Sequence, residues 1–212
     1  MNPSKWLIPA AAALWLFCAH AVFAAAPSSD ALMSESFQQF DQKMDTGWRT
    51  LQLKGDYLGA ADAILRYRTL HAAELDDWQK GSLAFHLGHC YAMAGETAKA
   101  IAAFRDALAS GGWGNPAYIE GFIAFLQGDK TTLMDARHAI AATNPGPWQK
   151  DDLAEMDAML TYFGQPFEAA WAALNCHDPG IKTDTPEWAA YCHAADRKYR
   201  NTFLAHGVKL PE

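Results

Sequence analysis

The stretch from Gly81 to Gly114 most constrains what this chain can fold into. It reads GSLAFHLGHCYAMAGETAKAIAAFRDALASGGWG. A Leu-Gly pair is followed after three positions by Tyr, and an Ala is followed after four by Phe; these residues are Leu87, Gly88, Tyr91, Ala100 and Phe104. Gly95 lies where two antiparallel helices would turn, since Gly readily adopts the left-handed conformation that ends a helix. The stretch therefore predicts a helical hairpin.

Three further stretches repeat this plan of helix, glycine turn and helix. The first starts with apolar residues at spacings of three and four, which predict one helix: Met33, Phe37, Phe40, Met44, Trp48 and Leu51. Its partner starts near Tyr57. The third hairpin starts at Asn115-Pro116, a capping residue before the residue best tolerated at the first helical position. The fourth runs from Trp148 to about Leu174.

The turn glycines of the four hairpins follow one another at similar intervals. They are Gly55, Gly95, Gly128 and Gly164, and the intervals are 40, 33 and 36 residues. With the motif in the second hairpin, the chain from about Phe37 to Leu174 resembles the tetratricopeptide-repeat (TPR) family, whose period is 34 residues. It departs from the family pattern at Ala84, where the pattern has Trp, and at Gly112, where it has Pro.

The resemblance implies an all-α fold, a right-handed α-solenoid of about four TPR-like hairpins spanning residues 37–175. Residues 176–212 are then a loop and a C-terminal capping helix. That helix is expected to start at Thr185-Pro186-Glu187 and to bury one face. The residues of this face are Trp188, Tyr191, Ala195, Tyr199 and Phe203. A terminal element of this kind covers the open edge of the last repeat.

The first 24 residues have the pattern of a secretory signal peptide. Lys5 precedes an apolar run from Trp6 to Cys18, and Val22-Phe23-Ala24 offers a small-residue cleavage site. Residues 25–36 are then a flexible lead. We expect a periplasmic or secreted protein with no membrane insertion after cleavage. Removing a segment with one Lys and no acid takes the net charge from −7 to −8, which gives no electrostatic reason to bind nucleic acid.

Three cysteines remain after cleavage. Cys176 ends the fourth hairpin and Cys192 lies early in the capping helix, with 15 residues between them. Thiols outside the cytoplasm tend to pair, so we expect a structural disulfide between these two. Closing such a loop stabilises the fold by roughly 3 kcal/mol. Cys90 lies in the densest part of the second hairpin and is expected to be a small buried hydrophobe.

The resemblance also implies a site for a partner. TPR proteins typically bind an extended peptide or a helix in a concave groove, lined mainly by the first helix of each hairpin. By register, the groove residues here are Arg49, Phe85, His86, His89, Tyr118, Phe122 and Tyr162. The expected function is a non-enzymatic scaffold for a protein or peptide partner in the cell envelope. The same aromatic residues could instead be core between helices.

One alternative function uses His86, His89 and Cys90. These residues form an H-x2-H-C cluster, which would suit a protein that handles zinc or copper or that has a redox role. The spacing matches no known zinc pattern, so no metal or other cofactor is expected. The sequence has no G-x-S-x-G, H-E-x-x-H, Walker or G-x-G-x-x-G motif. An enzyme is not expected, although an active site without a local motif stays open.

Overall fold

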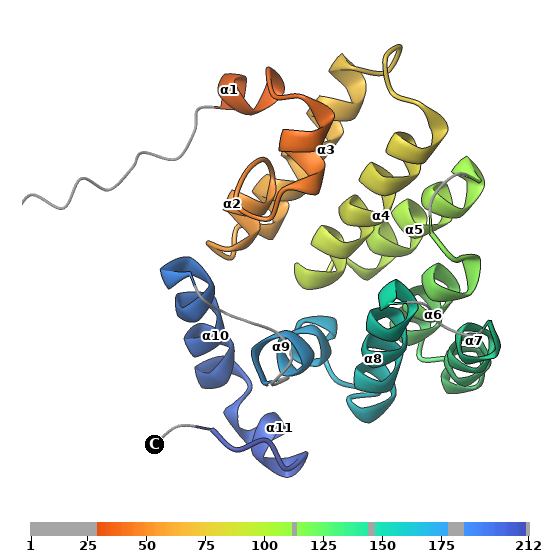
Figure 1. Ribbon diagram of the computed structural model, residues 1–212. Helices are drawn as coiled ribbons and strands as arrows, with labels where there is room; N and C mark the ends of the chain where they lie inside the picture. The colour runs from red at the N-terminus through yellow and green to blue at the C-terminus, as the bar shows by residue number, and fades with distance from the viewer. Residues whose placement is uncertain (1–28, 112–113, 144–146, 178–184, 211–212) are drawn as a thin grey trace, which may run out of the picture.

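Every regular element in the described part of the chain is a helix or a helical turn (Figure 1). The computed structural model describes residues 29–111, 114–143, 147–177 and 185–210. The expected signal peptide, residues 1–24, lies outside these ranges. None of the helices within them is long and apolar enough to cross a membrane.

Consecutive helices pack in pairs from residue 77 to residue 177. The pairs are α4 (Asp77–Met93) with α5 (Thr97–Ser110), α6 (Pro116–Gln127) with α7 (Lys130–Ala142), and α8 (Pro147–Thr161) with α9 (Phe167–His177). The expected hairpins two, three and four therefore exist as packed helix pairs.

The turns inside the hairpins are made as the sequence predicts. All four turn glycines have positive φ, between 72° and 82°: Gly55, Gly95, Gly128 and Gly164. Aspartates then cap several following helices. The side chain of Asp56 accepts a hydrogen bond from the Gly59 N–H at the start of α3 (Tyr57–Leu70), and Asp129 accepts one from the Thr132 N–H at the start of α7.

The Leu-Gly pair of the second hairpin serves close helix packing. A Cβ on Gly88 would lie 2.7 Å from the ring of Phe104, so only glycine lets α4 approach α5 this closely. Gly88 and Phe104 belong to the pattern that marked this stretch in the sequence.

The expected single helix from Met33 to Leu51 is wrong. The chain forms α1 (Ser29–Met33), a π-helical turn η1 (Gln38–Gln42) and α2 (Arg49–Gln52). Gly47 has φ +59°, and a Cβ there would lie 1.9 Å from the backbone oxygen of Phe40. The Thr46 hydroxyl also donates to the Gln39 carbonyl at 2.5 Å. The chain thus turns back onto η1, which a straight helix cannot do.

Order begins earlier than the sequence suggests. Residues 29–36 were expected to belong to a flexible lead, but Leu32 and Met33 are buried. They pack in the N-terminal core with side chains of α3 and α4. The Tyr67 hydroxyl also donates to the Glu35 carbonyl, and His71 Nε2 lies 3.0 Å from the Met33 carbonyl oxygen, so polar contacts add to this packing.

The C-terminal region returns toward the start of the fold. Here α10 (Pro186–Lys198) and α11 (Arg200–Ala205) replace the single expected helix, with a break at Tyr199 (φ −112°, ψ 19°). In Figure 1, α10 lies next to the end of the molecule where α2 meets α3. Helix α9 also packs against α4, so the last hairpin contacts the second one directly.

Candidate functional site

The structure divides the seven expected groove residues into two groups. Phe85, His89, Phe122 and Tyr162 are buried, with at most 7% of each residue exposed. Arg49, His86 and Tyr118 are partly exposed. Only the second group offers surface to a partner in this conformation.

Three of the four buried groove residues, His89, Phe122 and Tyr162, are covered by later segments of the chain itself. From α9, Phe167 lies with its ring centre 5.3 Å from that of His89 and 5.6 Å from that of Phe122. Trp171, also on α9, lies 5.4 Å from His89. Tyr162 stacks on His206, just after α11, at 4.5 Å. The part of the groove that the sequence places around these residues is filled from within the chain.

Asp41 is the centre of a polar network that sequence reasoning missed. Its side chain is fully buried and accepts four hydrogen bonds. The donors are Trp48 Nε1 at 3.0 Å, His86 Nδ1 at 2.8 Å, Gln42 Nε2 at 2.6 Å and Ser82 Oγ at 2.7 Å. A signal was present, because Asp41 is four residues after Phe37 and seven before Trp48 and so interrupts the apolar stripe.

The surroundings of Asp41 keep it ionised. Burial by itself raises the pKa of the carboxyl group, but the hydrogen bonds from His86 and Ser82 and the charge of Arg49 outweigh it. The pKa of Asp41 therefore lies well below its usual range. A buried charge is tolerated here because each lone pair has a donor.

The network fixes Arg49 and the ring of His86. Arg49 Nη1 donates to the backbone oxygen of Asp41, and its guanidinium lies 4.2 Å over the ring of Trp48. Arg49 Nη2 lies 3.3 Å from His86 Nε2. Because arginine only donates, Nε2 accepts this bond and the proton of the imidazole lies on Nδ1, toward Asp41.

This arrangement differs from a hydrolytic Asp–His pair. In such a pair the imidazole nitrogen facing away from the carboxylate meets a nucleophile. Here that nitrogen meets Arg49, and Ser82 already donates to Asp41. The geometry orients a cation and an imidazole at a surface, which suits binding.

Arg49 and His86 continue into a row of side chains that crosses four helices. The ring of Phe85, next to His86, lies 5.5 Å from the ring of Tyr118 on α6. The Tyr118 hydroxyl donates to Glu155 on α8. We call Arg49, His86, Phe85, Tyr118 and Glu155 the cross-helix row. Its members come from α2, α4, α6 and α8, the first helix of each hairpin.

The far end of the cross-helix row is acidic. Burial, with the nearby charges of Asp152 and Asp151, raises the pKa of Glu155 to about 7 against the lowering effect of the Tyr118 hydroxyl. Burial and Asp151 raise the pKa of Asp152 to about 6. The row thus carries a fixed cation at Arg49 and carboxyl groups at the opposite end.

The histidine–cysteine cluster is not arranged as a metal site. Burial, with His86 and Arg49 next, lowers the pKa of His89 to about 3, so the ring is neutral at pH 7. Cys90 is fully buried, as expected, and burial raises the pKa of its thiol. Across the described ranges, no three His, Cys, Asp or Glu side chains are placed to hold a metal ion.

A second polar centre, around Glu168, joins the first hairpin to the C-terminal helices. Glu168 accepts hydrogen bonds from the hydroxyls of Tyr57 at 2.7 Å and Tyr199 at 2.6 Å, and it pairs with Lys198. Glu168 and Lys198 also line two cavities, of about 550 and 280 Å³. No sequence pattern marked Glu168 as the centre of such a contact.

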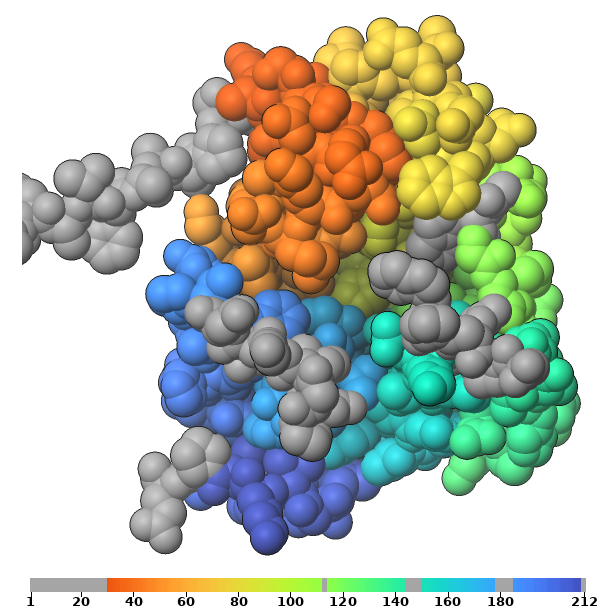
Figure 2. All heavy atoms as spheres, viewed as in Figure 1, coloured from red at the N-terminus to blue at the C-terminus, as the bar shows by residue number. Residues whose placement is uncertain are grey.

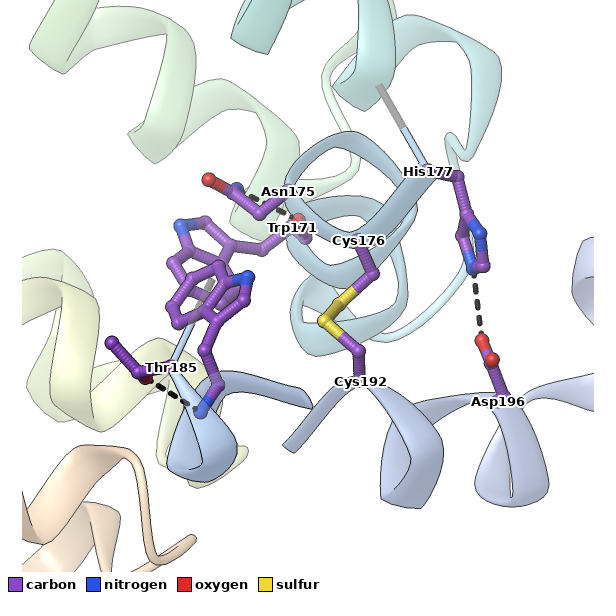
Figure 3. Close-up of a disulfide and its surroundings, with 8 residues drawn as sticks. Trp171, Asn175, Cys176, His177, Thr185, Cys192 and Asp196 are labelled. Carbon is purple, nitrogen blue, oxygen red and sulfur yellow. Dashed lines mark hydrogen bonds and ion pairs between the residues drawn. A yellow bond between two sulfur atoms is a disulfide. The ribbon is translucent and has the colours of Figure 1, made fainter. Parts of the chain in front are cut away.

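The expected disulfide is confirmed. Cys176 at the end of α9 and Cys192 on α10 are bonded, with Cα atoms 5.5 Å apart. His177 Nε2 lies 2.9 Å from Asp196 Oδ1, so a second link runs beside the disulfide between the same two helices (Figure 3). Together these links hold α10 against α9.

The sequence matches no family model, and neither a curated protein nor a solved structure shows significant similarity to it. The proposed function therefore rests on the geometry of this chain alone.

Proposed function

We propose that this protein is an exported TPR-like scaffold that binds a protein or peptide partner in the cell envelope along the cross-helix row. The observation that carries the proposal is the row itself: the first helices of four successive hairpins each contribute a side chain to one connected line. A partner that follows this line would contact every hairpin, which is how helical repeat proteins bind extended chains.

The architecture proposed with it is a right-handed solenoid of about four TPR-like hairpins closed by the C-terminal helices. Three observations support it: the packed helix pairs, the positive φ of the four turn glycines, and the close approach of α4 and α5 at Gly88. The Cys176–Cys192 disulfide supports export, since disulfides persist in oxidising compartments.

The row has the chemistry of a recognition surface. Arg49 is held by Asp41 and Trp48 before any partner arrives, so binding costs little side-chain entropy. Tyrosine and arginine are also the residue types that dominate binding energy at protein interfaces. In Figure 2 the N-terminal segment (orange) and the C-terminal helices (blue) leave a hollow between them, with yellow-green atoms of the α4 region visible inside.

Site-specific photo-crosslinking tests the proposal. A photoreactive amino acid at position 118, in protein expressed with its own leader, should crosslink one recurrent envelope protein, identified by mass spectrometry. The same amino acid at position 105, on the exposed surface of α5, is the matched control. Adding Arg49→Gln should abolish the crosslink at position 118. Equal crosslinks from both positions, or a crosslink insensitive to Arg49→Gln, would contradict partner binding along the row.

A further inference from the structure

The larger cavity lies between the start of the fold and its C-terminal helix, away from the cross-helix row. It has a volume of about 550 Å³, within the range of small-molecule sites. One wall is the turn from α2 to α3, another is the face of α10, and Glu168 of α9 lies between them. The lining residues are Leu53, Lys54, Gly55, Tyr57, Glu168, Glu187, Ala190, Tyr191, Ala194, Ala195 and Lys198.

Two of the four charged groups in this lining neutralise each other. Lys198 pairs with Glu168, whose oxygens also accept hydrogen bonds from two tyrosine hydroxyls. Glu168 is therefore already satisfied and has little to offer a ligand.

The other two charges have no ion pair within the described ranges. Lys54 lies on the α2–α3 turn and Glu187 in the first turn of α10, and both are exposed. They belong to different walls of the cavity and do not pair with each other. The cavity thus offers one cation and one anion to whatever enters it.

Between these charges the lining is mostly apolar. Ala190, Ala194 and Ala195 form a smooth face of α10, and Leu53 lies on the opposite wall. An apolar body therefore fits the lining between the two charges.

From these contacts we propose that the cavity binds a small zwitterion with an apolar body: a free amino acid with an apolar side chain, or a short peptide of such residues. The carboxylate would pair with Lys54 and the ammonium with Glu187, while the side chain lies against the alanine face of α10. An end of a folded protein offers only one of the two charges, so the site differs from the proposed partner surface and does not depend on it.

Calorimetric titration of the purified, oxidised protein tests this with defined probes. L-Leucine, L-phenylalanine and L-leucyl-L-leucine are the zwitterions; N-acetyl-L-leucine lacks the ammonium and L-leucinamide lacks the carboxylate. We expect at least one zwitterion to bind saturably with one-to-one stoichiometry. Its two leucine analogues should bind at least tenfold more weakly than leucine, because each loses one charge-assisted hydrogen bond. These arms use the unaltered protein.

Charge-removing variants then assign each end of the ligand. Lys54→Gln should weaken leucine at least tenfold but leave leucinamide unchanged, and Glu187→Gln should weaken leucine but leave N-acetyl-leucine unchanged. Lys99→Gln, which removes an exposed lysine of α5 paired with Glu96, is the matched control and should bind like the unaltered protein. Unchanged melting temperatures would show that the variants fold.

Three results would overturn the proposal. These are no saturable heat from any zwitterion up to about 10 mM, equal binding of the capped analogues, or leucine affinity unaffected by both charge-removing variants. Binding of the zwitterions with the expected pairing of variant and analogue would establish the site.

Discussion

Replacing Asp41 with Asn should strongly destabilise the fold, although the side chains are nearly the same size. Asp41 is fully buried, and its two oxygens accept four hydrogen bonds from Trp48, His86, Gln42 and Ser82. Asparagine keeps one oxygen and replaces the other with an NH2 group. If the NH2 group faces Trp48 and His86, both of these donors lose their acceptor. If it faces Gln42 and Ser82, the Ser82 hydroxyl can rotate to accept from it, but Gln42 Nε2 loses its acceptor.

The size of the loss follows from the donors left without an acceptor and from the lost charge. Each such donor costs about 1–3 kcal/mol, so one or two cost about 1–6 kcal/mol. The variant also removes the carboxylate charge beside Arg49. We expect the free energy of unfolding to fall by about 3–5 kcal/mol, the range for breaking a buried charge network by removing one partner.

Equilibrium unfolding in urea, followed by far-UV circular dichroism at pH 7, measures this change. Asp56→Asn is the matched control. Asp56 is exposed and caps α3 by accepting a hydrogen bond from the Gly59 N–H at 2.9 Å, a role that Asn fills equally well. The control should change stability by less than about 0.5 kcal/mol. A loss below about 1 kcal/mol for Asp41→Asn would refute the idea that this network organises the N-terminal region.

The same network gives a pH dependence of known sign. The pKa of Asp41 in the fold lies below its unfolded value of about 3.9. Its ionisation therefore stabilises the fold fully above that value, and the contribution is lost as the pH falls below about 4. The stability difference between the unaltered protein and Asp41→Asn should narrow as the pH is lowered from about 5 to 2.

Three further predictions concern the backbone, the disulfide and one hydroxyl. Gly47→Ala should cost at least about 2 kcal/mol more than Gly55→Ala in urea unfolding, because a Cβ meets a backbone oxygen at the first site and nothing within 4 Å at the second. Replacing both Cys176 and Cys192 with Ser should lower stability by about 3 kcal/mol, and dithiothreitol should have the same effect on the unaltered protein but none on the variant. Tyr191→Phe should leave stability unchanged or raise it, since its buried hydroxyl has no partner among the described residues; a loss above about 1 kcal/mol in the same assay would contradict this.

The helix pairs were predictable because their signals are local. A turn glycine, a capping aspartate or a proline at the first helical position each acts within a few residues, and all four turn glycines have the expected backbone conformation. The disulfide was also predictable, because the expected compartment and the position along the chain both favoured Cys176 and Cys192. Both kinds of prediction need no knowledge of distant contacts.

The prediction of one continuous helix in the first hairpin was wrong because the contacts that decide this region are distant in the sequence. The period from Met33 to Leu51 is helical, yet the chain breaks because Asp41 must reach donors on α4, among them Ser82, 41 residues later. Local sequence patterns do not predict a contact between residues so far apart. The repeat register assigned Arg49, His86 and Tyr118 to the groove, and these residues are partly exposed in the structure. It also assigned Phe122, which instead packs against Phe167 of α9, a helix that the register did not place at the groove.

The tie between Tyr57 and Glu168, 111 positions apart, has a consequence for how the molecule melts. In an open array of helix pairs each unit touches only its neighbours, so the ends can fray independently. Here the first helix pair and the last are joined through the Glu168 carboxylate, and the Tyr199 hydroxyl donates to the same carboxylate. Loss of the C-terminal helices would therefore release α3 as well, and the two ends should unfold in one cooperative transition.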